Sequence, residues 1–320
     1  MDKVIVTGVA GFLGSFLAER LIKDNNFVIG IDNLFRGKRE NINHLFKYNN
    51  FEFQIVDVSK EVNKLCKLFE NVDFIFHYAA INGTQHFYER PLEVLETNVE
   101  GTINMLKAAS KNSIEKFVFA SSSEVYGDPL YFPTDEKHPI LLPKVDNPRH
   151  SYAASKAIGE FYVKWYAEVF SFNYLVMRIF NVYGPRMDTS KYGQVIPEFI
   201  RKILVEPEFE IIGSGTQTRS FCYIEDNIEM TLKAFDSIKN EILNIGNNYE
   251  VKILDLAQIM HEILGKKFKY KLLSPREGDP LRRVPNIEKF LSMTGCRPKI
   301  SLKEGLERTI DWYRRAWGLT

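Results

Sequence analysis

A tyrosine, a lysine and a serine in the middle of the chain have the types and spacing needed to move a proton. Tyr152 and Lys156 are four residues apart in a stretch of helical periodicity, residues 152–170. Residues four apart lie on one helix face, so the ammonium group would lie beside the phenol and favour its phenolate, lowering a tyrosine pKa that is ordinarily about 10. Such a tyrosine can take the proton of a substrate hydroxyl while a hydride leaves the same carbon. Ser122, at the end of a predicted strand, can hydrogen-bond that hydroxyl.

A glycine-rich turn near the N-terminus predicts a dinucleotide site. Gly8, Gly11 and Gly14 have the spacing GxxGxxG where the first predicted strand meets the first predicted helix. Glycines permit the tight turn and let backbone N–H groups reach a pyrophosphate at the helix N-terminus. Asp32 ends the second predicted strand, where a carboxylate is expected to hold the adenosine ribose. Because a carboxylate there would repel a 2′-phosphate, Asp32 favours NAD over NADP.

Two points stay open near the ends of the second and third predicted strands: the choice between NAD and NADP, and the role of Asp57. Arg36 and Arg39 follow Asp32 closely, and their charges weaken the preference for NAD. Asp57 ends the third strand and would suit the adenine amino group, but it would equally suit the N-cap of the next helix.

The elements that must position these residues alternate between strand and helix. Helical periodicity marks residues 12–24, 60–70, 91–112 and 152–170. Runs that are apolar at nearly every position, as in strands covered on both faces, occur at residues 4–6, 27–31, 51–56, 74–78, 116–120 and 174–179. The pattern predicts an α/β fold with a Rossmann-type, doubly wound parallel sheet.

The regular alternation of strands and helices ends after Gly184 and Pro185, which predicts a smaller C-terminal α/β lobe for the substrate. We expect a helix over residues 194–205, strands over 208–212 and 220–224, and short helices from about residue 252. The predicted domains are residues 1–183 for the dinucleotide and 184–320 for the substrate, with residues from about 219 to 247 packing back on the first domain. No flexible linker separates them, so we expect a cleft between packed lobes.

Composition excludes several other classes. The 320 residues are 45% hydrophobic and 26% charged, as in ordinary globular proteins. With 42 basic and 41 acidic residues, neither a nucleic acid nor a membrane surface is an expected partner. Three widely spaced cysteines without a CxxC pair predict no disulfide framework and no metal site. No apolar run approaches the ~20 residues of a membrane span, and no signal-peptide pattern is seen, so we expect a cytoplasmic protein.

Taken together, the motifs resemble those of the extended short-chain dehydrogenase/reductase family, in its nucleotide-sugar epimerase/dehydratase branch. The resemblance covers essentially the whole chain. It rests on residues 7–14, 32–34, 77–80, 97–102, 121–127, 152–156, 178–186, 213–226, 244–246 and 276–279. It implies bound NAD, a nucleoside diphosphate sugar as substrate, and oxidation at C4 of the hexose to a transient 4-keto sugar.

The resemblance also implies roles for individual residues. Tyr152 would be the base, Lys156 its partner and a contact of the nicotinamide ribose, and Ser122 the residue beside the sugar 4-hydroxyl. Besides Tyr152 and Lys156, the implied cofactor site comprises Gly8, Gly11, Phe12, Leu13, Gly14, Asp32, Asn33, Asp57, Val58, Ala79, Ala80 and Asn98. The implied substrate site comprises Asn181, Arg186, Gln217, Arg219 and Arg276, with Arg282 a weaker candidate. We expect residues 81–88 to touch the sugar and His77 to be structural.

The fate of the 4-keto sugar stays open between three reactions. A 4-epimerase needs only the serine, tyrosine and lysine, and is the first expectation. Glu124 would serve a nucleotide-glucuronate decarboxylase or a 4,6-dehydratase, and Arg149 resembles a decarboxylase residue that would hold a carboxylate. The aspartate of many dehydratases is absent, since Ser123 stands at that position. Two remoter alternatives are an NADPH-dependent carbonyl reductase and a non-catalytic dinucleotide sensor.

The family is usually dimeric through two helices of each subunit. Here they would lie near residues 97–110 and 152–168, and the second carries more aromatic bulk than one sheet-facing stripe needs. Core packing is the alternative explanation of those aromatic residues.

Overall fold

Seven parallel strands form the central sheet of the computed structural model, which describes residues 1–142, 144–189, 194–206, 208–275 and 280–319. The strand order is β11-β6-β5-β4-β1-β2-β3, and every neighbouring pair is parallel. The strands are β1 (Lys3–Thr7), β2 (Phe27–Asp32), β3 (Phe51–Ile55), β4 (Phe74–His77), β5 (Lys116–Ser122), β6 (Asn173–Ile179) and β11 (Glu241–Ile245). The order reverses between β1 and β4, which places a crevice at their carboxyl ends. The first six strands confirm the predicted doubly wound sheet.

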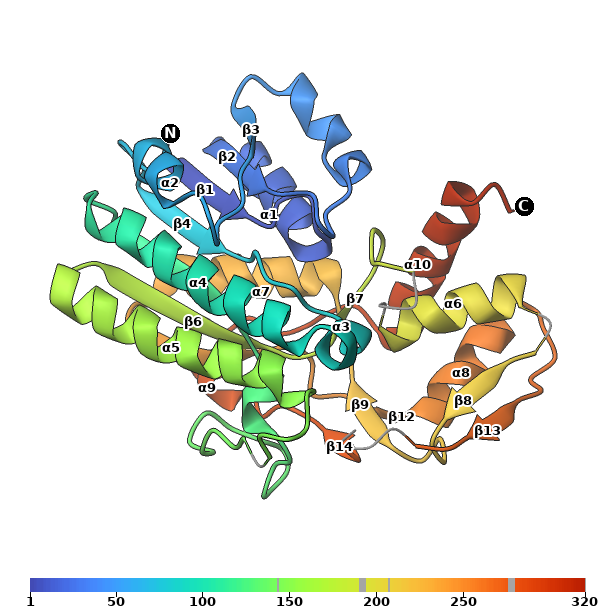
Figure 1. The fold of residues 1–320 in the computed structure, drawn as a ribbon. Coiled ribbons are helices and arrows are strands. Elements are labelled where there is room, and N and C mark those ends of the chain that lie inside the picture. Colours follow the sequence, from blue (N-terminus) through green and yellow to red (C-terminus); the bar gives the residue numbers. More distant parts are fainter. Residues whose placement is uncertain (143, 190–193, 207, 276–279, 320) are drawn as a thin grey trace.

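Helices cover both faces of this sheet, which explains why its inner strands are mostly apolar, whereas the edge strand β3 carries Glu52 and Gln54 between apolar residues. In β1, Val4 and Val6 pack into one hydrophobic cluster and Ile5 into another, and all three are buried. The first cluster contains residues of α1 (Phe12–Lys23) and α7 (Ile224–Ser237). The second contains residues of α2 (Val62–Leu68), α4 (Pro91–Ser110) and α5 (His150–Phe170). Figure 1 shows α4 and α5 side by side across the front of the sheet. In the described part of the chain, no helix combines the length and apolar character of a membrane span.

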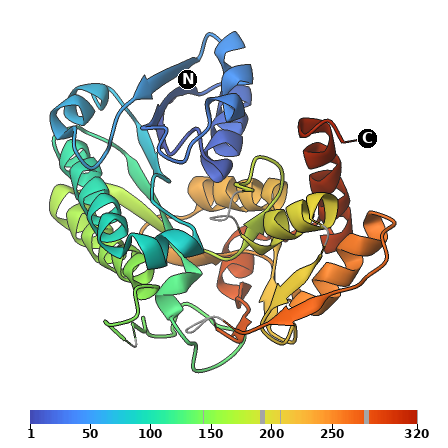
Figure 2. The same cartoon turned by 45° about the vertical axis from the view of Figure 1, so that its right-hand side comes forward.

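The C-terminal lobe consists of helices and small sheets. Two of the small sheets have the strand orders β12-β9-β14 and β13-β8, and β10 pairs with β7. Figure 2 shows this lobe beside the central sheet, with α6 and α10 near the C-terminus. Its elements are β7 (Val182–Tyr183), α6 (Val195–Val205), β8 (Glu210–Ile212), β9 (Thr218–Ser220), β10 (Cys222–Tyr223), β12 (Glu250–Lys252), α8 (Ile253–Ile263), β13 (Lys271–Leu273), β14 (Arg282–Arg283), α9 (Glu288–Thr294) and α10 (Leu302–Ala316).

The predicted strand over residues 220–224 is wrong in detail. β9 ends at Ser220 and pairs with β12, whereas β10 pairs with β7, so the chain changes sheets at Phe221. Ile224 already begins α7. β11, from the C-terminal half, was not among the predicted strands, and it pairs with β6 at the edge of the central sheet.

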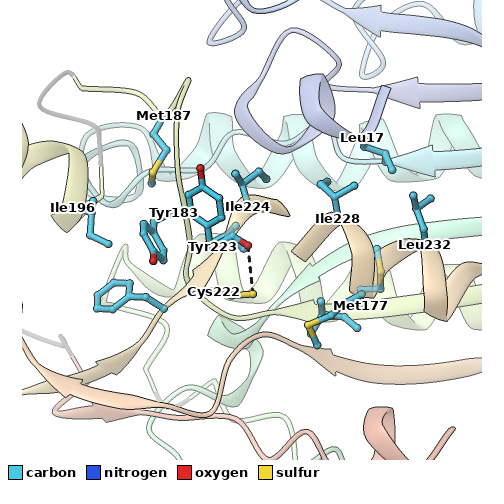
Figure 3. Close-up of a cluster of buried hydrophobic side chains, with 14 of the residues drawn as sticks. Leu17, Met177, Tyr183, Met187, Ile196, Cys222, Tyr223, Ile224, Ile228 and Leu232 are labelled. Atoms are coloured by element: carbon cyan, nitrogen blue, oxygen red, sulfur yellow. Dashed lines mark hydrogen bonds between the residues drawn. The ribbon is translucent and has the colours of Figure 1, made fainter. Parts of the chain in front are cut away.

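One hydrophobic cluster continues from the central sheet into the C-terminal lobe. Its buried members include Leu17 of α1, Ile228 of α7, Ile196 of α6 and Tyr313 of α10. Figure 3 shows part of it, with Met177, Tyr183 and Tyr223 among the side chains near α7. Because the two halves share this core, the walls of the cleft between them are fixed by continuous packing.

Candidate active site

A cavity of about 700 Å³ lies at the carboxyl ends of the central strands and extends into the C-terminal lobe. It brings together residues that are far apart in the sequence. The predicted residues that line it are Gly8, Gly11, Phe12, Leu13, Gly14, Asp32, Asn33, Asp57, Val58, Ala79, Ala80, Ser122, Glu124, Tyr152, Lys156, Asn181, Arg186, Gln217 and Arg219. Arg276 lies outside the described residues.

The glycine turn forms a cradle at the cavity wall whose backbone is packed too closely for side chains at Gly8 and Gly14. A Cβ atom on Gly14 would lie 2.2 Å from the Gly8 carbonyl oxygen, and Gly8 itself has a φ of +69°. α1 begins at Phe12, and its N-cap, Gly11, makes no side-chain capping hydrogen bond. The first N–H groups of α1 therefore have no side-chain cap, and they line a cavity in which a pyrophosphate would fit.

Two backbone hydrogen bonds hold the Asp32 carboxylate at the cavity wall. Its Oδ2 accepts from the Ala10 N–H at 3.0 Å and its Oδ1 from the Leu34 N–H at 2.8 Å. Burial raises its pKa, against these two hydrogen bonds. Each oxygen keeps a further lone pair with which to accept from a ribose hydroxyl, so the geometry fits the adenosine end of a dinucleotide.

Two interpretations from the sequence disagree with the structure: the helix N-cap at Asp57 and the place of Asn98 in the lining of the cofactor site. Asp57 accepts from the Ser59 N–H at 3.0 Å and from its hydroxyl at 2.6 Å, and α2 begins only at Val62, so the N-cap interpretation is wrong. Asn98 does not line the cavity. Its side-chain amide bonds the backbone of Ile81 and the Ser155 hydroxyl behind the wall, so it positions the strand end and α5.

The serine, tyrosine and lysine meet at the buried end of the cavity. Ser122 lies near Tyr152 and lowers its pKa against the larger effect of burial, and Tyr152 stacks on Phe87 with ring centroids 4.9 Å apart. The Lys156 Nζ lies 5.8 Å from the centre of the Tyr152 ring and donates to the Ala120 carbonyl at 2.7 Å. Burial raises the pKa of Tyr152 and lowers that of Lys156 to about 7. Both shifts favour the neutral forms, because burial penalises the charged form of each group, so the structure does not show the lowered Tyr152 pKa that the four-residue spacing predicts.

Glu124 projects into the same cavity between two arginines. Its Oε1 lies 2.7 Å from Arg283 Nη1 and 3.5 Å from Arg149 Nη2, and both guanidinium groups are almost fully buried. Burial opposes ionisation, but the charges of Arg283, Arg149 and Arg219 outweigh it and lower the pKa of Glu124. A charged carboxylate and its counter-ions thus lie beside the tyrosine, where the Glu124 charge also raises the pKa of Tyr152.

A buried network of hydrogen bonds and an ion pair, not predicted from the sequence, connects α5 to β5 and β6. Glu160 of α5 accepts from the Ser121 hydroxyl at 2.5 Å and pairs with Arg178 of β6 at 2.7 Å. Arg178 in turn lies over the Tyr126 ring, 4.8 Å from its centre.

His77 is a structural residue, as the sequence predicts. It forms hydrogen bonds with Thr7 at 2.8 Å and Thr102 at 3.2 Å, and burial lowers its pKa to about 3, so it stays neutral.

The polar residues predicted to bind the substrate make different contacts in the substrate half of the cavity. Asn181 and Gln217 line the wall and each donates to a backbone carbonyl, of Ser220 and Ile212 respectively. Arg186 lines the wall too, but its guanidinium pairs with Glu19 of α1 at 2.9 Å. Arg282 is wrongly predicted: Glu250 holds it at the exposed surface.

Arg283, the residue that follows Arg282, lines the cavity instead. Because adjacent residues of a strand point to opposite faces, the choice between these two arginines needed the register of β14, which the sequence does not reveal.

Residues 4–246 match the NAD dependent epimerase/dehydratase family. This chain belongs to that family. A putative UDP-glucose 4-epimerase of Methanocaldococcus jannaschii is 38% identical over 97% of this chain and 98% of its own length. A UDP-N-acetyl-alpha-D-glucosaminuronate decarboxylase of Bacillus cytotoxicus is 35% identical, over 98% of both chains. A UDP-glucose 4-epimerase of Thermotoga maritima, solved with UDP-glucose, superposes with a TM-score of 0.91 at 29% identity, covering 98% of this chain and 99% of that one.

Membership of the epimerase/dehydratase family identifies the chain as an NAD-dependent family enzyme with a Rossmann-type sheet. The relatives divide between epimerases and decarboxylases at similar identity, so the reaction must be argued from the site.

Proposed function

We propose that this chain oxidises the C4 hydroxyl of a nucleoside diphosphate hexose and then acts as a 4-epimerase. The observation that carries the proposal is the meeting of Ser122, Tyr152 and Lys156 at the buried end of one cavity whose other walls are the glycine cradle and the C-terminal lobe. Asp32 at the adenosine end favours NAD over NADP, because its buried carboxylate leaves no room for a second anion.

The chain's own residues perform the proton chemistry. Ser122 hydrogen-bonds the sugar 4-hydroxyl and orients it toward Tyr152, which accepts the proton as its phenolate forms. Lys156, held above Phe119 and beside the tyrosine, stabilises that phenolate. NAD, when bound in the cradle, would supply the hydride acceptor at C4. Rotation of the 4-keto sugar and return of the hydride to its other face would complete epimerisation without any further residue.

Decarboxylation of a nucleotide glucuronate is the second candidate, because a specific observation favours it. Glu124 lies ionised between Arg283 and Arg149 inside the cavity, an arrangement for which epimerisation has no use. An arginine released from Glu124 would hold a C6 carboxylate, and a C4 ketone would accept the electrons left when carbon dioxide departs. The Bacillus cytotoxicus relative, a decarboxylase by name, supports this alternative.

Product analysis separates the two reactions. The purified protein is incubated with UDP-glucose, UDP-N-acetylglucosamine, UDP-glucuronate and dTDP-glucose, and each is followed by mass spectrometry after isomer-resolving chromatography. A new peak of unchanged mass supports epimerisation. Loss of carbon dioxide from the glucuronate, or of water from a hexose, replaces it by the corresponding lyase. No turnover, with no NAD released on denaturation, contradicts the proposed function altogether.

We also propose that the chain forms a homodimer through α4 and α5. The outer face of α5 exposes large apolar side chains, with Phe161 61% and Trp165 57% exposed, together with Val169 and Phe170. A contiguous exposed apolar surface of this kind is typical of protein–protein contact.

A further inference from the structure

Arg36, in the loop after β2, joins three segments that are distant in the sequence. One of its terminal nitrogens, Nη1, donates to the Asn82 carbonyl in the loop after β4. The other, Nη2, lies 3.0 Å from Asp188 Oδ2, in the segment after β7 that enters the C-terminal lobe. A single side chain therefore ties the dinucleotide-binding half to both the sugar-side loop and the substrate lobe.

These contacts lie at the wall of the cavity in which the dinucleotide would lie. Arg36, Asn82 and Asp188 all line the cavity that also contains the glycine cradle and Tyr152. A dinucleotide that extends from Asp32, past the cradle, to Tyr152 runs alongside the Arg36 side chain. The Arg36 charge reaches that end of the groove, since it acts on Tyr152 and lowers its pKa, against the larger effect of burial.

In this arrangement only two of the three guanidinium nitrogens of Arg36 have a hydrogen-bond partner among the described residues. Both partners of its terminal nitrogens are in place, yet Nε is buried and has no hydrogen-bond partner among the described residues. Leaving one guanidinium N–H unpaired costs free energy. Its side chain and that of Asp188 are about one-quarter exposed, so the ion pair is moderate in strength. A ligand in the groove that supplies an acceptor for Nε would therefore stabilise this arrangement of Arg36.

We propose that Arg36 is a positioning residue that straps the bound dinucleotide into its groove through the Asp188 ion pair, and so couples cofactor retention to occupancy of the substrate lobe. The inference rests on the proposed function, since it takes the groove to hold a dinucleotide. Coupling is reciprocal: a nucleotide in the substrate lobe that stabilises the segment after β7 with the Arg36–Asp188 pair formed strengthens retention of the cofactor, and bound cofactor strengthens nucleotide binding by the same factor.

The test measures cofactor release rather than turnover. NADH is bound to the apoprotein, its dissociation is followed by fluorescence on dilution into excess NAD, and the rate is compared with and without UDP. In the wild-type protein UDP slows release. In Arg36→Gln and Asp188→Asn we expect release in the presence of UDP to be about fivefold to tenfold faster and the effect of UDP to disappear. Because all three variants lack the Arg36–Asp188 ion pair, the double variant loses no more of the UDP effect than either single variant.

Arg39→Gln is the matched control. Arg39 follows in the same loop, but its guanidinium lies over the rings of Phe46 and Phe53, at 5.3 and 5.8 Å, and it does not line the cavity. We expect wild-type release and a wild-type UDP effect. Thermal unfolding of each apoprotein shows whether a variant has lost its fold, in which case Arg36→Lys, which keeps the charge but not the two-pronged contact, replaces it.

Two results would contradict the proposed role of Arg36. If Arg36→Gln binds NADH and UDP still slows its release as in the wild type, Arg36 does not couple the two sites, while the proposed function stands. If the wild-type protein binds no NADH, the strap and the proposed function fail together.

Discussion

At the scale of single residues, Tyr152 carries the proton step. Tyr152→Phe removes the hydroxyl but keeps the stack on Phe87, so the fold and the cofactor groove should persist. We expect kcat to fall by about 10²–10⁴, the usual contribution of a general acid or base. The measurement is the initial rate on the sugar that the wild-type protein turns over. The variant should retain as much NAD as the wild type, and a loss of less than threefold would assign the base to another residue.

Glu124→Gln distinguishes the two candidate reactions at the same scale. The amide keeps the size of the side chain but removes the charge that pairs with Arg283 and Arg149. For an epimerase we expect kcat on a neutral hexose to change less than about tenfold, because Glu124 takes no part in that chemistry. If the substrate is instead a nucleotide glucuronate, a drop of about 10² or more in the rate of carbon dioxide release would favour the decarboxylase. Thermal unfolding belongs beside the kinetics, since two buried arginines lose their counter-ion and the variant should be less stable.

Among the elements, α1 is tied to the segment after β7 by a small ion cluster around Glu19. Burial alone would raise the pKa of Glu19, but hydrogen bonds from Lys23, Arg186 and His44 outweigh it and lower the pKa to about 2. A carboxylate with a depressed pKa stabilises the fold above its unfolded pKa, near 4.5, and the contribution is lost as the pH falls toward 2.

Glu19→Gln should therefore destabilise the protein at neutral pH, by about 1–3 kcal/mol, and hardly at all near pH 2. Urea unfolding of variant and wild type at pH 7 and at the lowest pH where both stay folded checks the sign. Glu61→Gln is a suitable comparison, because Glu61 pairs with Lys64 at 3.6 Å on the exposed surface and should change stability little. An equal effect of Glu19→Gln at both pH values would show that its charge is not the source of the stability.

The elements also show what the sequence can predict and where it stops. Five of the six strands of the N-terminal half are legible because they are apolar at most positions, and β3 is legible because Glu52 and Gln54 alternate with apolar residues. β11 escaped prediction because Glu241 and Asn244 interrupt its apolar run, and only pairing with β6 makes it part of the sheet. Local motifs identified Tyr152 and Lys156.

Contacts between distant segments could not be read in the same way. Nothing near Arg36 in the sequence points to Asp188, which is 152 residues away, and nothing near Tyr152 points to the ring of Phe87. Such pairs depend on how the loops at the carboxyl ends of different strands are folded toward one another.

For the whole molecule, the proposed dimer gives a direct prediction. In both views α4 and α5 lie side by side on the outside of the sheet, away from the C-terminal lobe (Figures 1 and 2). Replacing Phe161 and Trp165 together by glutamate places two charges on the exposed face of α5. We expect the wild-type protein to elute as a dimer and the variant as a monomer, measured by size-exclusion chromatography with light scattering. The same mass for both proteins would argue that this face has another role.

The late position of β11 in the chain has a consequence for how the protein is made. β6 lies next to β5 on one side, but its other edge is covered only by β11, which ends at residue 245. While the polypeptide is being synthesised, that edge stays unpaired until nearly four-fifths of the chain has emerged. An open edge of buried, apolar strand is a template for pairing with other chains. The nascent protein therefore has a long interval of exposure to aggregation, during which chaperone binding would cover the open edge.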